Sequence, residues 1–342
     1  PVAAILRRYL RVERQGPRWI RGVGEPIALI GRRLEKDLRR VRFDSICAGL
    51  QKFTEEVMAQ WVSAWMEETG LGRVLVAGGV FMNVKASKMI CELPMLESFA
   101  AFPSCGDESL PFGACYLAAA ADELTPKPLV HAYLGPDLGM EECRAAVADI
   151  GDRVEVEQPE QMADRVAQLL AAGEIVARAA GPMEFGARAL GSRSILADPI
   201  NQDVVRVINR MIKKRDFWMP FAPVVRRRDA AEYFRNPKDL PSPYMMNTFD
   251  STEKRSDFMA AVHNADLTAR PQLLEDGQNP GYEAILERFA ARTGRHVLLN
   301  TSFNLHGEPV VCGAADAVRV LLTSGLRHLI LGHLLVSKRG AP

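Results

Sequence analysis

The stretch VLLNTSFN at residues 297–304 places an apolar run directly before three polar side chains in steps of two. Val297–Leu299 are typical of a buried strand, and alternate residues of an extended strand point to the same face. Asn300, Ser302 and Asn304 therefore present two amides and one hydroxyl where the strand ends. The sequence on both sides has helical periodicity, and a strand between two helices is typical of an α/β fold.

A second motif, PMEFGARALGSRSILADP, lies at residues 182–199. Gly186 and Gly191 allow bare backbone to approach a ligand closely. Arg188 and Arg193 carry forked guanidinium groups that suit the oxyanions of a phosphate. With Ser194 and Glu184 in the same stretch, the motif predicts a phosphate-binding loop.

A third motif, IKKRDFWMPFAP, lies at residues 212–223 and places Lys213 and Arg215 two residues apart. In an extended segment this spacing directs two cations to one spot. Taken singly, each of the three motifs is also typical of a solvated loop, surface charge or a local cap. Their occurrence together favours one nucleotide site.

Composition indicates an ordinary soluble protein of two domains. The 342 residues are 48% hydrophobic and 25% charged, and a chain of this length can bury two cores. None of the six cysteines forms a CxxC pair, which disfavours a zinc ribbon or a disulfide scaffold and favours a reducing, cytoplasmic location. No apolar run is long enough for a membrane span, and no signal peptide is recognisable.

The first 42 residues are strongly basic, with twelve Arg or Lys against four Asp or Glu, although the whole chain carries a net charge of only +1. A nucleic-acid-binding arm is one interpretation. We favour a surface or seam that contacts a partner segment upstream, because the chain starts at Pro1 within helical sequence.

Periodicity predicts alternating helices and strands along the chain. We expect a linker near 122–137 and a long polar loop at 235–257. The expected helices are 43–68, 114–121, 140–150, 159–172, 201–211, 280–293 and 314–323. The expected strands are 73–77, 153–157, 174–179, 224–225, 296–300 and 328–336.

Two turns in the first third of the chain are weaker candidates. Gly78 and Gly79 follow the expected strand 73–77 and lead to Asn83, an arrangement that can bring a phosphate or ribose to a helix N-terminus. Asp107 follows a second strand-like run and could bind a cation or a sugar hydroxyl. The alternative is that Asp107 or Ser109 caps the next helix.

With these motifs in view, the chain resembles the O-carbamoyltransferases of nodulation-factor and antibiotic biosynthesis, of the tobramycin carbamoyltransferase-like type. LVAGGVFMN and PSCGDESLPFGA are similar to the second lobe of that family's actin-like (ASKHA, RNase H-like) domain. The three motifs above are similar to its YrdC-like domain. The resemblance implies an incomplete actin-like lobe at 1–125, without its first lobe, and a YrdC-like α/β domain with a twisted mixed sheet at 126–342.

The resemblance also implies a two-stage reaction. The YrdC-like domain would form carbamoyl-adenylate from ATP and carbamoyl phosphate, with Mg²⁺, and the actin-like domain would pass the carbamoyl group to a hydroxyl of a sugar, antibiotic or Nod-factor-like acceptor. Lys213, Arg215, Arg188 and Arg193 would stabilise the phosphate charge, and Ser302 with Asn304 would hold the nucleotide. The remaining residues expected at the nucleotide or substrate are Glu184, Gly186, Gly191, Ser194, Asn300, Gly78, Gly79 and Asn83.

The same resemblance assigns Asp107 to a metal site, expected to hold divalent iron together with two histidines. The family's HxxxH pair is missing, because all six histidines lie from His131 onward. We therefore expect an upstream actin-like lobe, in the same or a separate polypeptide, to complete the site. Two smaller departures are Ala187 at a position where proline is common and Met219 where many members carry arginine.

Three alternatives remain. Carbamoyl-adenylate synthases of hydrogenase maturation share both domain types but carry CxxC zinc fingers and the opposite domain order. A threonylcarbamoyl-adenylate synthase for transfer RNA modification would not explain the actin-like segment. A nucleotide- or RNA-binding module without turnover rests on the basic residues 1–42 alone, and we expect no nucleic-acid partner.

Overall fold

The computed structural model describes residues 1–148, 150–214 and 219–340. Its contacts divide the chain into two compact units, Pro1–Phe102 and Pro103–Pro342. The division falls upstream of the expected linker, because residues after Pro103 pack on the C-terminal unit, as in the contact between the rings of Phe112 and Phe185 with centroids 5.0 Å apart. The domain boundary that the family resemblance places at 125/126 stays a prediction, because a division of the chain by its contacts does not test a boundary inferred from sequence similarity.

The N-terminal unit is built around the long helix α3 (Phe43–Thr69), which confirms the helix expected at 43–68. Its Phe53 and Val57 are buried as the periodicity requires, but Trp65 remains 44% exposed. The helix ends at Gly70, which has φ +69° and donates its N–H to Met66, a conformation that glycine adopts without strain. The other elements of this unit are α1 (Val2–Leu6), β1 (Leu10–Glu13), β2 (Arg18–Arg21), α2 (Ile27–Leu38), β3 (Arg73–Val76), η1 (Gly79–Met82), α4 (Val84–Cys91) and β4 (Ser98–Ala101).

Strands β1 and β2 form an antiparallel hairpin, whereas β3 and β4 pair in parallel. The hairpin lies in the basic segment 1–42, where no strand was expected. Part of the basic charge is balanced within the unit, for example by the ion pair between Arg8 and Asp37 at 3.0 Å and by the pair of Arg33 with Glu25.

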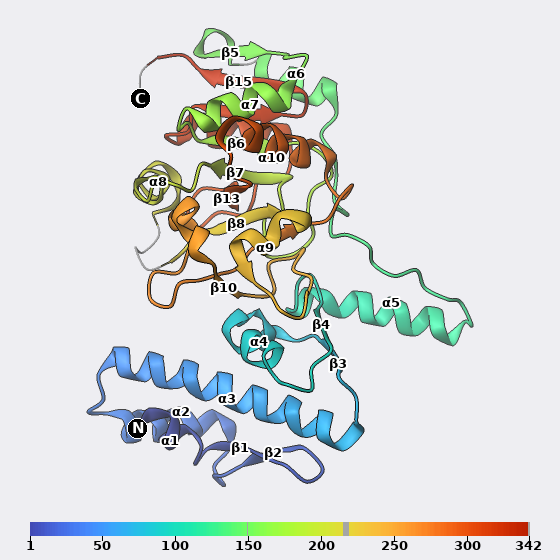
Figure 1. Ribbon diagram of the computed structural model, residues 1–342, viewed down its shortest axis with the longest axis vertical. Coiled ribbons are helices and arrows are strands. Elements are labelled where there is room, and N and C mark those ends of the chain that lie inside the picture. Colours follow the sequence, from blue (N-terminus) through green and yellow to red (C-terminus); the bar gives the residue numbers. More distant parts are fainter. Residues whose placement is uncertain (149, 215–218, 341–342) are drawn as a thin grey trace. The chain divides into compact units, whose positions relative to one another are not determined.

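The C-terminal unit contains an eight-stranded mixed sheet in the order β12-β8-β13-β7-β6-β14-β15-β5 (Figure 1). The pairs β12–β8 and β14–β6 are parallel, and the remaining neighbours are antiparallel. The strands are β5 (Val154–Glu157), β6 (Val176–Ala179), β7 (Arg193–Ala197), β8 (Ala222–Arg226), β12 (Gln272–Leu274), β13 (Val297–Ser302), β14 (His328–Leu331) and β15 (Leu334–Lys338).

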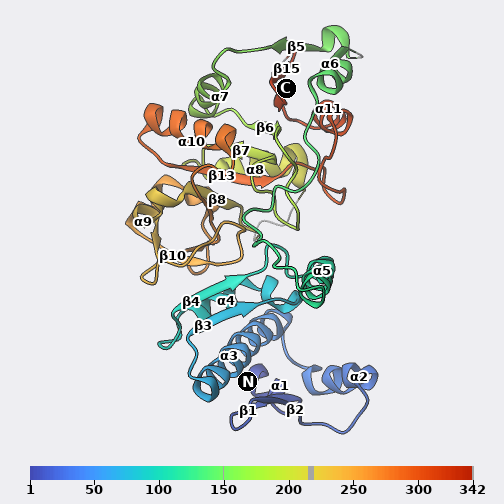
Figure 2. The ribbon, with the colours of Figure 1, turned by 90° about the vertical axis from the view of Figure 1, so that its right-hand side faces the viewer.

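Helices cover both faces of this sheet, with α7 and α10 on one face and α6 and α11 on the other (Figure 2). Alternate side chains of one strand enter different cores: Leu298 of β13 packs with the α7 and α10 side, whereas Leu299 packs with the α11 side. The central strands are therefore apolar on both faces and read as continuous hydrophobic runs. The helices are α5 (Leu110–Ala121), α6 (Met140–Ala148), α7 (Met162–Ala171), α8 (Asp203–Ile208), α9 (Ala230–Tyr233), α10 (Pro280–Thr293) and α11 (Ala314–Thr323).

Two expectations for this unit were wrong. The strand expected at 328–336 is a hairpin of β14 and β15 that turns at Gly332, with φ +58°. The expected long loop contains β10 (Phe249–Ser251), which pairs with β9 (Phe234–Arg235) and β11 (Thr268–Ala269) in a three-stranded sheet. These strands are too short for an alternation of apolar and polar residues to be recognised in the sequence.

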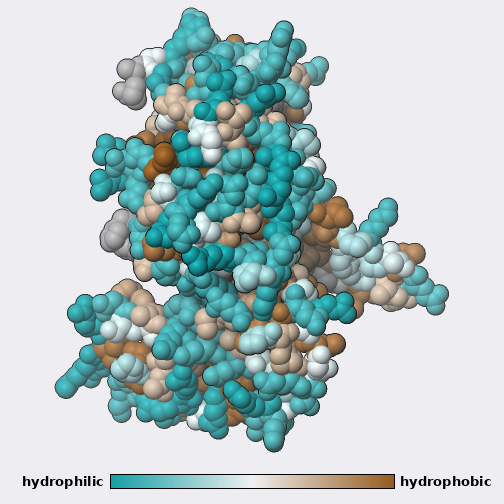
Figure 3. Space-filling model, in the orientation of Figure 1, coloured by the Kyte–Doolittle hydropathy of each residue, from teal (hydrophilic) through white to brown (hydrophobic). Residues whose placement is uncertain are grey.

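Helix α5 is apolar throughout and contains no buried residue. Its Leu117 is 75% exposed, and Figure 3 shows hydrophobic residues, drawn in brown, in this region of the surface.

Across the described residues, no helix combines the length and the apolar character needed to cross a membrane.

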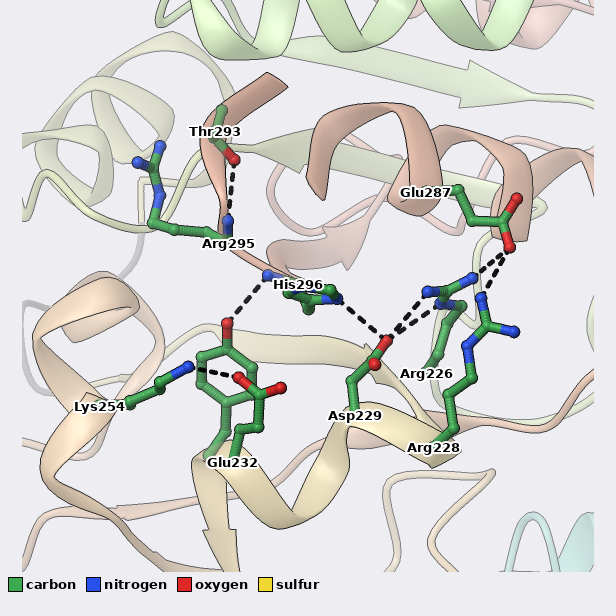
Figure 4. A network of polar contacts seen from close by, with 10 residues as sticks. Arg226, Arg228, Asp229, Glu232, Lys254, Glu287, Thr293, Arg295 and His296 are labelled. Carbon is green, nitrogen blue, oxygen red and sulfur yellow. Dashed lines mark hydrogen bonds and ion pairs between the residues drawn. The ribbon is translucent and has the colours of Figure 1, made fainter. Parts of the chain in front are cut away.

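A polar network surrounds the start of β13 (Figure 4). Arg226 pairs with Asp229 at 3.1 Å and also with Glu287. Arg228 reaches the same Glu287 at 2.9 Å, and His296 Nδ1 lies 3.3 Å from Asp229. Each of the two arginines thus meets a carboxylate, and the network joins β8, α10 and β13.

Candidate functional site

The polar residues at the end of β13 surround the side chain of Lys213. Lys213 Nζ donates hydrogen bonds to Ser302 Oγ at 3.0 Å, to Asn304 Oδ1 at 2.5 Å and to the Asn304 carbonyl at 3.3 Å. Ser302 Oγ in turn donates to Asn304 Oδ1 at 2.7 Å. The structure therefore brings together Lys213, Ser302 and Asn304, although 89 residues separate the first two in sequence.

Local structure holds this group in place from both sides. Lys213 is the last residue of η4 (Asn209–Lys213), a π-helical turn, and the following Lys214 has φ +45°. Asn304 is fixed by its Nδ2, which donates to the carbonyls of Leu305 at 2.9 Å and Glu308 at 2.8 Å. Lys213 is only 1% exposed, so its ammonium group has little freedom to move.

Glu184 organises the arginine-rich loop. Its Oε1 accepts hydrogen bonds from the backbone N–H groups of Leu190 at 2.6 Å, Ser192 at 3.2 Å and Arg193 at 3.2 Å. A carboxylate that accepts several backbone N–H groups fixes the course of the chain. The structure thus gives Glu184 a position inside the loop, whereas the sequence predicted a contact with the ligand.

The two glycines of the loop have left-handed conformations, with φ +106° at Gly186 and +115° at Gly191. A Cβ at Gly191 would lie 2.2 Å from the ring of Tyr282, and one at Gly186 would lie 2.9 Å from Ser104 Cβ. Close packing against protein therefore requires glycine at both positions, and the approach of a ligand to them stays a prediction.

Arg193 and Ser194 are also engaged within the protein. Arg193 is fully buried and donates to the carbonyls of Cys312, Gly181, Ser192 and Pro136. Burial lowers its pKa, while Glu184 acts in the opposite direction. Ser194 Oγ accepts from Gly191 N at 3.0 Å. These contacts differ from the predicted grip on phosphate, because the donors of Arg193 face backbone carbonyls.

A cavity of about 320 Å³ adjoins the end of β13, and we name it the β13 cavity. Arg188, Asn300 and Ser302, three of the predicted residues, line it together with Arg270 and Met219. The described residues that line it include no Asp or Glu. Phosphate groups there would therefore meet the cations Arg188 and Arg270 and the amide of Asn300.

Arg270 is the charged lining residue that the sequence motifs did not predict. It follows β11, in the sequence TARPQLL, which carries no motif. It lies between β11 and β12, and β12 pairs with β8, whose residue Ala222 also lines the cavity.

Asn300 is buried, and its Nδ2 donates to the Ala189 carbonyl at 3.0 Å and to Gln272 Oε1 at 3.2 Å. Its Oδ1 is buried and has no hydrogen-bond partner within the described part of the chain. An orphaned acceptor that lines a cavity can take a donor from a ligand.

The weaker candidates at the first turn belong to the N-terminal unit. Gly78 has φ +108° and precedes η1, which begins at Gly79. Asn83 caps α4, because its Oδ1 accepts from Ala86 N at 3.2 Å, and its Nδ2 donates to Gln51 Oε1 at 3.0 Å. The structure thus shows a capping contact for Asn83, and ligand binding by these three residues stays a prediction.

Asp107 lies in the C-terminal unit, where it begins η2 (Asp107–Ser109) and is exposed. Neither it nor Ser109 caps α5 through its side chain, and Ser109 Oγ donates to the Gly106 carbonyl at 2.8 Å. Over residues 1–148, 150–214 and 219–340, no three His, Cys, Asp or Glu side chains gather as a metal site would require. The described residues therefore do not fit the iron site expected at Asp107.

Arg215, the remaining predicted cation, lies outside the described residues.

Comparisons with known proteins agree on one family. A family model described as "Carbamoyltransferase C-terminus" matches residues 167–338. The nodulation protein NolNO of Sinorhizobium fredii is 34% identical over 302 residues, which cover 86% of this chain and 44% of that protein. The nodulation protein NolO of Bradyrhizobium diazoefficiens is 32% identical, with 86% and 55% covered. The 3'-hydroxymethylcephem-O-carbamoyltransferase of Amycolatopsis lactamdurans is 36% identical over 169 residues, with 49% and 32% covered.

The chain thus spans about half the length of the nodulation relatives it matches. Among solved structures, full-length HypF in its phosphate- and nucleotide-bound form matches with 14% identity and a TM-score of 0.36, over 56% of this chain and 23% of that one. At this level of similarity the two folds are not shown to be the same.

Proposed function

We propose that this chain, which belongs to the carbamoyltransferase family, is the part of an ATP-dependent O-carbamoyltransferase that forms carbamoyl-adenylate. The substrates are ATP and carbamoyl phosphate. Water releases carbamate and phosphate from carbamoyl phosphate, and a carbamate oxygen then attacks the α-phosphorus of ATP while pyrophosphate leaves. The carbamoyl group subsequently passes to a hydroxyl of a small-molecule acceptor.

The observation that carries the proposal is the arrangement at the end of β13. Lys213 is held by Ser302 and Asn304 beside a cavity that Arg188 and Arg270 line. Phosphoryl transfer needs fixed positive charge more than covalent chemistry, because the transition state spreads negative charge over the phosphate oxygens. A cation that is already positioned does not have to be reorganised when pyrophosphate leaves.

The other residues have complementary parts in this proposal. Asn300 Oδ1 is a buried acceptor and would receive an N–H of the base or of the carbamoyl group. Glu184 and Arg193 do not touch the substrate and instead hold the loop that presents Arg188. Mg²⁺ bound with ATP would add charge neutralisation at the phosphates. The described residues do not fit an iron site, so no step is assigned to iron.

Transfer to the acceptor requires more than this chain in our proposal. The chain spans about half of its nodulation relatives, and Asp107 has no metal-binding companions among the described residues. A single carboxylate gives neither the ligand number nor the geometry of a stable catalytic metal site. We propose that an upstream actin-like lobe supplies the missing ligands and closes the acceptor site.

The test is an assay of the 342-residue chain with ATP, Mg²⁺ and carbamoyl phosphate. We expect mass spectrometry to detect carbamoyl-adenylate, with release of pyrophosphate that depends on carbamoyl phosphate. Acceptor carbamoylation should appear only after addition of the upstream segment of a nodulation relative. The absence of carbamoyl-adenylate and of pyrophosphate release from the folded protein would refute the first step. Full acceptor carbamoylation without the segment would refute the second.

A further inference from the structure

The C-terminal unit contains a second cavity, of about 500 Å³, that none of the sequence motifs predicted. It lies beside the N-terminus of α10, and residues of α10, of α7 and of the segment that follows β6 line it. We name it the α10 cavity. Met162, Ile285 and Ile330 supply apolar wall, and Arg178, Ser192 and Asn279 supply polar groups.

Arg178 is a buried cation in the wall of this cavity. It lies on β6 and is only 5% exposed. Its Nη1 donates to the carbonyls of Ala180 at 2.9 Å and Gly191 at 2.6 Å, and its Nη2 donates to Asn279 Oδ1 at 3.3 Å. All three acceptors are uncharged.

Within residues 1–148, 150–214 and 219–340, no carboxylate forms an ion pair with Arg178. Glu184 attracts the guanidinium from a greater distance, and burial is the main influence and lowers the pKa of Arg178. Glu184 also faces Arg193, a second buried cation. Asp137 and Glu142 also attract Arg193, so Glu184 is the one carboxylate that acts on Arg178 among the described residues, and it does so without forming an ion pair. Burying an uncompensated charge is costly.

The start of α10 adds to the positive potential at the same place. The helix is 14 residues long, and Asn279 is its N-cap. A Cβ on Gly281 would lie 3.1 Å from Arg178 Nη2, so the first turn approaches the guanidinium closely. The N-terminus of a helix carries partial positive charge and favours anions. Asp137, the carboxylate that lines this cavity, is exposed to solvent.

We propose that the α10 cavity binds a small organic anion, a carboxylate or a phosphate monoester with an apolar body, at a site separate from the β13 cavity. The anionic group would lie between Arg178 and the first turn of α10, with Asn279 and Ser192 as further hydrogen-bonding groups. The apolar body would contact Met162, Ile285 and Ile330. The volume is within the range of ~300–1,000 Å³ that is usual for small-ligand sites.

The experiment uses phenyl phosphate as the probe and phenol as its neutral counterpart, with titration calorimetry on the full chain. The Lys213→Ala variant serves as background, so that binding at the β13 cavity is weakened. In that background Ala284→Phe fills the α10 cavity without removing a hydrogen bond, and Ala291→Phe adds the same ring two turns later on the same helix, where the residue is exposed. We expect Ala284→Phe to weaken phenyl phosphate binding by ~10-fold or more and Ala291→Phe to leave it unchanged.

Arg178→Gln tests the charge directly and should also abolish phenyl phosphate binding in protein that keeps its circular dichroism spectrum. Three results would overturn the proposal. One is the loss of all probe binding on Lys213→Ala, which would assign the probe to the β13 cavity. Another is equal binding by Ala284→Phe and Ala291→Phe. The third is equally tight, Ala284-dependent binding of phenol, which would make the cavity an apolar site.

Discussion

The two ends of β13 differ in how they surround their cations. At the start of the strand, Arg226 meets Asp229 and Glu287, and Arg228 meets Glu287 (Figure 4). At its end, the β13 cavity is lined by Arg188 and Arg270, and the described lining residues include no carboxylate. Lys213 beside it donates to a hydroxyl, an amide oxygen and a carbonyl.

The difference separates a structural role for charge from a binding role. A cation that meets a carboxylate lowers the cost of its own burial and joins the elements that carry the pair. A cavity whose described lining contributes two arginines and an amide attracts an external anion. Changes at the start of β13 should therefore affect stability, and changes at its end should affect the chemistry.

The largest effect is expected for Lys213→Ala. Loss of a preorganised charge-stabilising group costs ~2.7–4 kcal/mol, so carbamoyl-adenylate formation should slow by ~100-fold or more. Pyrophosphate release measures the rate. Lys214→Asn is the matched control, because Lys214 is exposed and asparagine tolerates its positive φ. Near-normal release by Lys213→Ala would contradict the assigned role.

Gly191→Ala should destabilise the fold by about 2–4 kcal/mol, since φ +115° strains any side chain and the new Cβ would lie 2.2 Å from the ring of Tyr282. Urea unfolding measures the loss. Gly173→Ala is the control, because Gly173 has φ +86° but no atom close to a Cβ, and it should lose only the strain term. Equal losses at the two glycines would mean that the tight packing at Gly191 has no energetic role.

At the start of β13, Asp229→Ala should lower the free energy of unfolding by about 1.5–3 kcal/mol, because it removes the bonds to the largely buried Arg226. The rate of carbamoyl-adenylate formation in the folded protein should not change. A loss of rate without a loss of stability would reverse the distinction between the two ends.

Ser302→Ala should slow carbamoyl-adenylate formation by ~10-fold, which corresponds to one hydrogen bond to a charged group of about 1.4 kcal/mol. Asn304 still holds Lys213 in this variant, so the loss should be smaller than for Lys213→Ala. Kinetics with ATP as the varied substrate test this order. A slower rate for Ser302→Ala than for Lys213→Ala would assign the main role to the hydroxyl.

The smallest effect is expected for Arg228→Ala, which removes an ion pair whose two side chains are 53% and 52% exposed. Exposed pairs contribute ~0–1 kcal/mol. The midpoint of urea unfolding should therefore shift much less than for Asp229→Ala. A shift as large as for Asp229→Ala would show that the network acts as one unit.

Local pattern in the sequence determined several elements of this fold. The helix expected at 280–293 is α10 (Pro280–Thr293), the one at 314–323 is α11 (Ala314–Thr323), and the strand expected at 296–300 lies within β13. Their apolar periods, the Asn279 cap and the terminal glycine Gly294 act over a few residues and can be read directly. The spacing of Asn300, Ser302 and Asn304 also predicted one polar strand end.

Tertiary structure alone decided which partners the polar and charged side chains of the predicted motifs have. Arg193 donates to the carbonyls of four separate residues, Glu184 accepts from the loop that follows it, and Arg270 reaches the β13 cavity from a segment without a motif. A sequence motif specifies which groups are present, but the burial of each group and its partners depend on strands that pair across long separations. The period of a helix is local, whereas the compensation of a buried charge is a property of the packed fold.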